Sequence, residues 1–162
     1  MDVYQVLMKD HRIVDELFRE IEKSDDREVK GREQLFARLR KELEDHTLIE
    51  EDIFYPWIEK LPGTKELVEQ SFEEHAEFEA ILQEVSEMRT NKNDWLEKIS
   101  ELKDVVQRHV RRQEEMMFPA ARKELDERLA EELGRQILEM KPERAAVIVG
   151  STHRRFDQRG AR

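Results

Sequence analysis

The chain has 162 residues, enough for one domain with its own buried core. Asp and Glu outnumber Lys and Arg by 39 to 29, a net charge of −10, which argues against a nucleic acid or an anionic membrane as a partner. There is no cysteine, so disulfides, thiolate metal sites and thiol chemistry are excluded. Without a signal-like N-terminus or a long apolar run, we expect a cytoplasmic protein.

Apolar residues recur at helical spacing and predict an all-α fold, an up-down-up-down four-helix bundle. We expect helices over about residues 3–22, from about residue 32 past Tyr55, from Thr64 to a break at 91–94, and from that break to Pro119, which bends or ends the last one. A short additional helix ends before Pro142. Residues 1–142 then form the domain, and 143–162 form a basic tail: a frayed end, a packed helix or a peptide that docks on a protein partner.

The second helix carries polar residues where a core should be apolar. Steps of three and four residues trace one stripe along it: Leu39, Leu43, His46, Glu50, Ile53, Trp57. His46 and Glu50 lie one turn apart in this stripe. Burying them without a partner costs a few kcal/mol. A metal ion is a partner that satisfies both.

Each of the other three long helices also places one histidine among apolar neighbours: His11, His75 and His109. A single histidine of this kind is more often a hydrogen-bonded core residue than a ligand. Four of them at related positions favour a metal site. The fifth, His153, lies in the basic tail, where we expect it to be exposed.

The spacing shows an internal duplication. His11 and His75 are 64 residues apart, and His46 and His109 are 63 apart. An acid and a proline follow the second histidine of each half at plus five and plus ten: Glu51 and Pro56, Glu114 and Pro119. Two helical hairpins related by a pseudo-twofold would bring two histidines from each half to one centre, which suits a two-metal site.

These residues resemble the hemerythrin-like, or HHE cation-binding, domain over residues 1 to about 140. The most specific segments are His46 to Pro56, Glu114 to Pro119, and His11 and His75 on their helices. The resemblance implies a four-helix bundle around two iron ions with an oxo or hydroxo bridge. The metal ligands it implies are His11, His46, Glu50, His75, His109 and a carboxylate after His109. The ferritin-like alternative needs a Glu three residues before a histidine, and no histidine of the bundle has one.

Two positions depart from the five-histidine members of that family. Glu79 stands where those members have a further histidine, so it replaces a nitrogen ligand, holds a water or leaves a coordination position open. After His109, Gln113 continues the inner stripe, whereas Glu114 lies about 100° round an ideal helix. We expect Glu114 to be the ligand, turned inward by a local bulge, because a carboxylate bridges two cations better than an amide does.

Imidazole and carboxylate ligands without sulfur suit iron, manganese or zinc. If the metals are two iron ions, the site has fewer nitrogen ligands than the five-histidine oxygen carriers have. We therefore expect it to react with hydrogen peroxide, O2 or NO, most concretely by breaking down peroxide. Glu79 or Tyr55 then assists proton movement. The alternative is a non-enzymatic module that binds or senses O2 or iron and signals through the tail.

Overall fold

The computed structural model describes residues 1–141, which are helical except for short connections, and it confirms the predicted all-α four-helix bundle. Pro142 and the tail from 143 to 162, with His153, lie outside the described residues, and so do the three roles considered for the tail. No helix within residues 1–141 has the length and hydropathy of a membrane-spanning segment. The helical segments, of which η1 and η2 are π-helical turns, are α1 (Val3–Lys23), α2 (Val29–Ile49), η1 (Glu50–Phe54), α3 (Tyr55–Ile58), α4 (Lys65–Ser86), α5 (Asn93–Arg112), η2 (Gln113–Met117), α6 (Phe118–Glu124) and α7 (Glu127–Met140).

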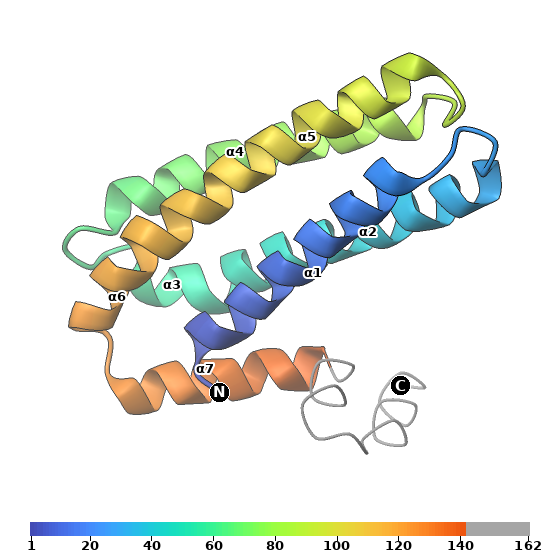
Figure 1. Cartoon of the computed structure of the whole chain (residues 1–162). Helices are drawn as coiled ribbons and strands as arrows, with labels where there is room; N and C mark the ends of the chain where they lie inside the picture. Colours follow the sequence, from blue (N-terminus) through green and yellow to red (C-terminus); the bar gives the residue numbers. More distant parts are fainter. Residues whose placement is uncertain (142–162) are drawn as a thin grey trace.

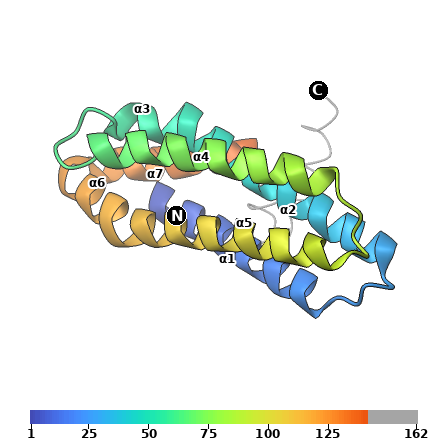
Figure 2. The ribbon, with the colours of Figure 1, turned by 90° about the horizontal axis from the view of Figure 1, so that it is seen from above.

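Two helical hairpins build the bundle, one from each half of the chain (Figure 1). The first pairs α1 with α2, which continues through η1 into α3; the second pairs α4 with α5, which continues through η2 into α6. Figure 2 shows these hairpins side by side, with their α1–α2 and α4–α5 turns at the same end of the bundle. Equivalent residues of the two halves therefore meet at the same level.

The apolar core is divided into two clusters, and the histidines lie between them along each helix. One cluster surrounds residues such as Tyr4, Phe54 and Phe118 at the end covered by α7. The other surrounds Phe18 and Trp95 toward the opposite end. A polar layer enclosed by apolar packing on both sides is shielded from water, so its electrostatic interactions are stronger than they would be at a surface.

A π-helical turn follows the second histidine of each hairpin. In η1 the N–H of Tyr55 bonds to the carbonyl of Glu50, five residues back, and η2 repeats this pattern at its own end. The extra residue in the turn rotates everything after it. The prediction that Trp57 continues the buried stripe is therefore wrong: Trp57 is exposed, and Phe54 and Ile58 are buried instead.

Both prolines of the duplicated motif lie just after these π-helical turns. Pro119 does not end its helix, since α6 continues to Glu124. It sits in the first turn of α6, and Pro56 has the same place in α3. A proline at the start of a helical segment is tolerated because its missing N–H is not needed there.

Helix α7 packs across the N-terminal part of α1 rather than extending the bundle (Figure 1). Gly134 makes this close packing feasible, because a Cβ at that position would lie 2.8 Å from the carbonyl carbon of Asp2. Lys141, directly after α7, is buried and forms an ion pair with Asp10 at 3.2 Å. The end of α7 therefore reaches the level of the histidines.

Candidate metal centre

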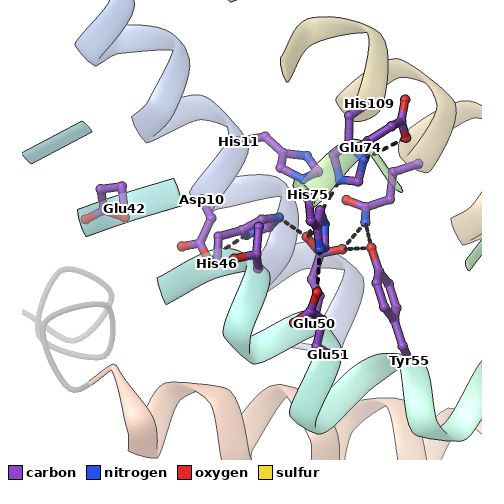
Figure 3. A network of polar contacts seen from close by, with 12 residues as sticks. Asp10, His11, Glu42, His46, Glu50, Glu51, Tyr55, Glu74, His75 and His109 are labelled. Atoms are coloured by element: carbon purple, nitrogen blue, oxygen red, sulfur yellow. Dashed lines mark hydrogen bonds and ion pairs between the residues drawn. The ribbon is translucent and has the colours of Figure 1, made fainter. Parts of the chain in front are cut away.

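Four histidine side chains, one from each long helix, converge in the polar layer (Figure 3). His11 and His46 of the first hairpin have ring centroids 4.9 Å apart, and His75 and His109 of the second have theirs 5.0 Å apart. All four are buried. Each ring leaves its Nε2 atom without a hydrogen-bond partner among the described residues, which is the state of a nitrogen available to a cation.

Glu50 provides the carboxylate at the centre of this cluster. Its Oε1 atom lies 2.5 Å from Nε2 of His46 and 3.8 Å from Nε2 of both His75 and His109. Glu50 is fully buried, and Oε1 has no hydrogen-bond partner within residues 1–141. One ligand atom each from Glu50, His75 and His109 fall within 4.8 Å of one another. A buried anion surrounded by imidazole nitrogens is a donor set for a divalent or trivalent metal.

The outer nitrogens of two histidines bond to carboxylates within their own hairpin. Nδ1 of His46 lies 3.1 Å from Oδ2 of Asp10, and Nδ1 of His109 lies 3.1 Å from Oε1 of Glu74. Asp10 and Glu74 are themselves 64 residues apart, each directly before the first histidine of its half. A cation neutralises each of them: Lys141 pairs with Asp10, and the guanidinium of Arg112 donates to Glu74.

The other two histidines bond to carboxylates across the hairpins. Nδ1 of His75 lies 3.1 Å from Glu51, and Nδ1 of His11 lies 2.7 Å from Glu114. Glu51 and Glu114 are the duplicated acids at plus five, and each belongs to the opposite half from the histidine it holds. All four rings thus have an outer carboxylate that orients Nε2 inward, as metal-binding histidines usually do.

The inward position expected for Glu114 is corrected by this arrangement. The π-helical turn exists, but Glu114 faces the outer nitrogen of His11, and its side chain is 36% exposed. Gln113 is the residue that enters the site: it is buried, and its Nε2 donates to Oε2 of Glu50. The turn begins at Gln113, so the extra residue is inserted after the inward-facing position rather than before it.

Tyr55 contacts the second carboxylate oxygen of Glu50, Oε2. Its hydroxyl donates to Oε2 of Glu50 and lies 3.0 Å from Nε2 of Gln113. Its ring stacks on His75 at a centroid distance of 5.9 Å. The residue that matches it in the other half is Phe118, so the pseudo-twofold is broken at this point: one half supplies Glu50 and Tyr55, and the other supplies Gln113 and Phe118.

Glu79 is not part of the cluster. Its side chain is 55% exposed and pairs with Arg40 of α2 at 3.4 Å. Phe72, three residues before His75, is also exposed. The buried face of α4 instead follows Glu74, His75 and Phe78. Therefore the structure does not bring Glu79 to the histidines as a ligand or proton donor.

Glu50 and the histidines beside it stabilise each other's charged forms. Burial alone would raise the pKa of Glu50, but His46 and His109 outweigh it and hold that pKa well below its usual range. Burial alone would lower the pKa of His46, but Glu50 and Asp10 outweigh it and raise the pKa to about 9. The His109 pKa is raised in the same way, by Glu50 and Glu74 against burial. Without a metal, protons on these rings neutralise Glu50.

The remaining imidazoles favour the neutral form. Burial lowers the pKa of His11 and of His75 despite the carboxylate beside each ring. Burial together with Glu50 raises the pKa of Tyr55 well above its usual range, so the hydroxyl keeps its proton. Neutral imidazole is the form that binds a metal.

Sequence comparison identifies the family to which this arrangement belongs. The Hemerythrin HHE cation binding domain profile matches residues 2–121, which include all four clustered histidines. The chain belongs to the hemerythrin HHE cation-binding domain family. That region ends within α6, so α7 lies outside the matched segment.

Three known proteins are similar to this member of the family. A DNA nickase of Nostoc sp. is 26% identical over 132 residues, which are 82% of this chain and 37% of that protein. A hemerythrin-like protein of Schizosaccharomyces pombe is 28% identical over 127 residues, 77% of this chain and 62% of that one. The chain thus spans less than two thirds of either relative.

A solved structure shares the fold. It is the crystal structure of a hemerythrin HHE cation-binding domain-containing protein from Mycobacterium kansasii, with a TM-score of 0.78 and 24% identity over 91% of this chain and 90% of that one. The likeness shows the same helical architecture. Cation binding by this family agrees with the four inward Nε2 atoms and with Oε1 of Glu50, which form no hydrogen bond within residues 1–141.

Sequence reasoning missed several members of the site. The sequence pattern does not predict Asp10 or Lys141 there, and Glu74 by itself has the pattern of a solvated acid beside a histidine. The signal that could have found Asp10 and Glu74 is the duplication itself, because both precede the first histidine of a half. Lys141 carried no such signal, since α7 has no counterpart in the first half.

Proposed function

We propose that this cytoplasmic protein is a non-haem di-iron protein that breaks down hydrogen peroxide and also reacts with O2 or NO. The observation that carries the proposal is the convergence of four unpartnered Nε2 atoms on one buried carboxylate. His11, His46, Glu50, His75 and His109 would hold the metals; Glu50, His75 and His109 already offer ligand atoms within 4.8 Å of one another. Bound iron supplies the exchange of electrons with peroxide; manganese and zinc are the other cations that such donors suit.

The donor set leaves room for a small ligand. Four imidazole nitrogens and one carboxylate are few donors for two metal ions, and Glu79 does not add another. The inner oxygen of Gln113 has no hydrogen-bond partner in the described part of the chain, so it can act as a weak neutral ligand or orient a bound molecule. Coordination positions open to exogenous ligands suit a reactive site better than a purely structural one.

Tyr55 is the residue that we propose handles protons. Its hydroxyl is buried, keeps its proton, and donates to Glu50 at the edge of the metal ligands. Breakdown of two peroxide molecules into one O2 and two waters moves two protons from one peroxide to the other. The Tyr55 hydroxyl would give its proton to the peroxide that is reduced and recover one from the peroxide that is oxidised, while Glu50 accepts its hydrogen bond and orients it.

Two measurements test this function: metal analysis of protein purified with abundant iron, and O2 evolution after peroxide is added. We expect two irons per chain and one O2 for every two peroxides consumed. Tyr55→Phe should lower kcat by about 10²-fold, the usual contribution of a positioned proton donor, with iron content unchanged. Glu79→Gln is the control and should retain full activity, because that side chain is on the surface.

The second candidate is a module that binds or senses O2 or iron without turnover. The ion pair between Lys141 and Asp10 favours it, since it connects the end of α7 to the carboxylate that holds His46. A reversible oxygenated spectrum with no peroxide consumption would decide for this candidate. Protein that purifies without iron would contradict both. The nicking activity named for the Nostoc relative is not transferred, because this chain spans 37% of that protein.

A further inference from the structure

A groove opens beside one histidine of the centre. It lies between α1 and α5 and has a volume of about 370 Å³. His11 and Glu114 line its inner end, and it is the end of the site at which Glu114 is partly exposed. The apolar part of its wall comes from valines and a phenylalanine of the two helices, and polar side chains line the rest: Val14, Phe18, Val106 and Val110, then Arg12, Asp15, Gln107 and Arg111.

The equivalent seam between α2 and α4 is crossed by an arginine. Arg40 of α2 bonds to Glu44 at 2.6 Å on its own helix and approaches Glu79 and Gln83 of α4, each at 3.4 Å. Glu79 lies one turn beyond His75, so this bridge runs over the seam next to the metal centre. The guanidinium is therefore placed where a ligand would have to pass.

The duplication shows why the α1–α5 seam differs. Lys103 matches Arg40 in the second half, but it pairs with Glu22 at 2.6 Å, three turns beyond His11. Asp15 matches Glu79, but it pairs with Arg19 on its own helix at 2.9 Å. Hence the ion pair that spans this seam lies far from His11, and the groove beside His11 stays open.

We propose that the α1–α5 groove is the route by which small uncharged ligands reach the centre, and that Val110 sets its width. This inference rests on the proposed function for the identity of the ligand. The valine and phenylalanine part of the wall leaves a passage suited to small uncharged molecules such as hydrogen peroxide, O2 and NO. Val110 is half-buried at the wall, where a larger side chain narrows the groove.

The test uses Val110→Trp, which fills the groove, Val110→Ala, which widens it, and Thr47→Trp as a matched control. Thr47 occupies the same place in the first half, one residue after His46, and is also half-buried. Binding of NO, a small uncharged ligand, to the ferrous protein is followed by stopped-flow absorbance. A gate slows entry and exit together, so Val110→Trp should lower both rate constants about tenfold with Kd unchanged, and Val110→Ala should raise both.

Thr47→Trp should leave both rates as they are. Equal slowing by the two tryptophans, or unchanged rates in Val110→Trp, would overturn the proposal. A changed Kd would also do so, because it would mean altered coordination rather than altered access. NO binding needs no turnover, so a protein that does not consume peroxide but shows these rates would contradict peroxide breakdown and support the proposed route.

A second readout needs no metal at all. Xenon enters small apolar cavities, and dissolved xenon should shift the methyl NMR signals of Val106 and Val14 in metal-free protein. Val110→Trp should abolish those shifts and Thr47→Trp should preserve them. Absence of xenon shifts at the groove in the unmodified chain would contradict the proposal even if iron does not bind.

Discussion

The amide of Gln113 donates a hydrogen bond to the carboxylate of Glu50, its counterpart 63 residues earlier in the duplicated chain. The two halves therefore contribute unequal groups at the same place: an acid from the first and an amide from the second. Among the described residues, Glu50 is the carboxylate that faces the inner nitrogens, whereas the buried Asp10 and Glu74 face the outer nitrogens of His46 and His109. Substitutions at this position should therefore change the charge of the centre and its affinity for metal.

Gln113→Glu should restore the missing carboxylate. A second acid beside Glu50 is expected to destabilise the metal-free protein by about 1–3 kcal/mol, because two buried carboxylates repel and lose the amide bond. With metal, the same change should tighten binding. Urea unfolding with and without metal, together with retention of metal against a chelator, measures both effects.

Glu114→Gln tests the position of the other candidate. As an outer partner of His11, Glu114 should be replaceable at a cost of about 10–100-fold in metal affinity, with the number of bound metals unchanged. Metal stoichiometry and chelator competition are the readouts. Loss of one metal ion per chain in Glu114→Gln would show instead that Glu114 is a ligand, as the sequence pattern predicts.

Lys141→Met should lower the stability of the fold, although Lys141 does not contact the clustered histidines directly. Lys141 is buried and pairs with Asp10 at 3.2 Å and Glu42 at 3.6 Å, so its removal withdraws a cation from buried acids. We expect a loss of about 1–3 kcal/mol in the free energy of unfolding. Lys123→Met, at an exposed position in α6, should change it little.

Removal of residues 143–162 tests whether the tail, rather than Lys141, contributes to stability and metal binding. If the domain ends at residue 142, as the sequence predicts, a chain shortened to that residue should keep its metal content. Metal analysis and urea unfolding of the shortened chain provide the comparison with Lys141→Met. Loss of metal from the shortened chain would place the domain boundary later in the sequence.

The metal-free protein should depend on pH through His46. Its pKa is about 9 in the fold, raised above the ordinary 6.5, so the folded state binds this proton more tightly than the unfolded chain does. The stabilisation is fully present below pH 6.5 and is lost as pH rises to about 9. The difference in unfolding free energy between the unmodified chain and His46→Gln should therefore shrink across that window. A difference that stays constant from pH 6 to pH 9 would contradict the raised pKa.

Metal removal should lower the free energy of unfolding by an amount that grows with the logarithm of the metal affinity. Ligand bound only to the folded state adds about 2.7 kcal/mol at a hundred times Kd. We expect chelation to lower Tm in the unmodified chain, and to leave Tm unchanged in His75→Ala if that variant no longer binds metal. Differential scanning calorimetry with and without chelator is the measurement.

The residues that the sequence identified best are those repeated in both halves. His11, His46, His75 and His109 lie on apolar stripes at matching intervals, and the structure brings all four together with Glu50. Helical period predicts such positions because residues three or four apart share one face of a regular helix. The bundle itself follows from the same periodicity and from short connections between the helices.

After His46 and His109, regular helical spacing no longer predicts which side chains face the core, and only the tertiary structure shows it. Each π-helical turn inserts one residue, so Trp57 turns outward, and Gln113 rather than Glu114 faces Glu50. The place of that insertion depends on how the chain packs against other helices, which no local pattern records. The contacts of Asp10 with Lys141 and of Arg40 with Glu79 join distant segments in the same way. Sequence alone therefore determined that a metal-binding bundle forms, whereas packing between helices decided which side chains face its centre and which seam leads to it.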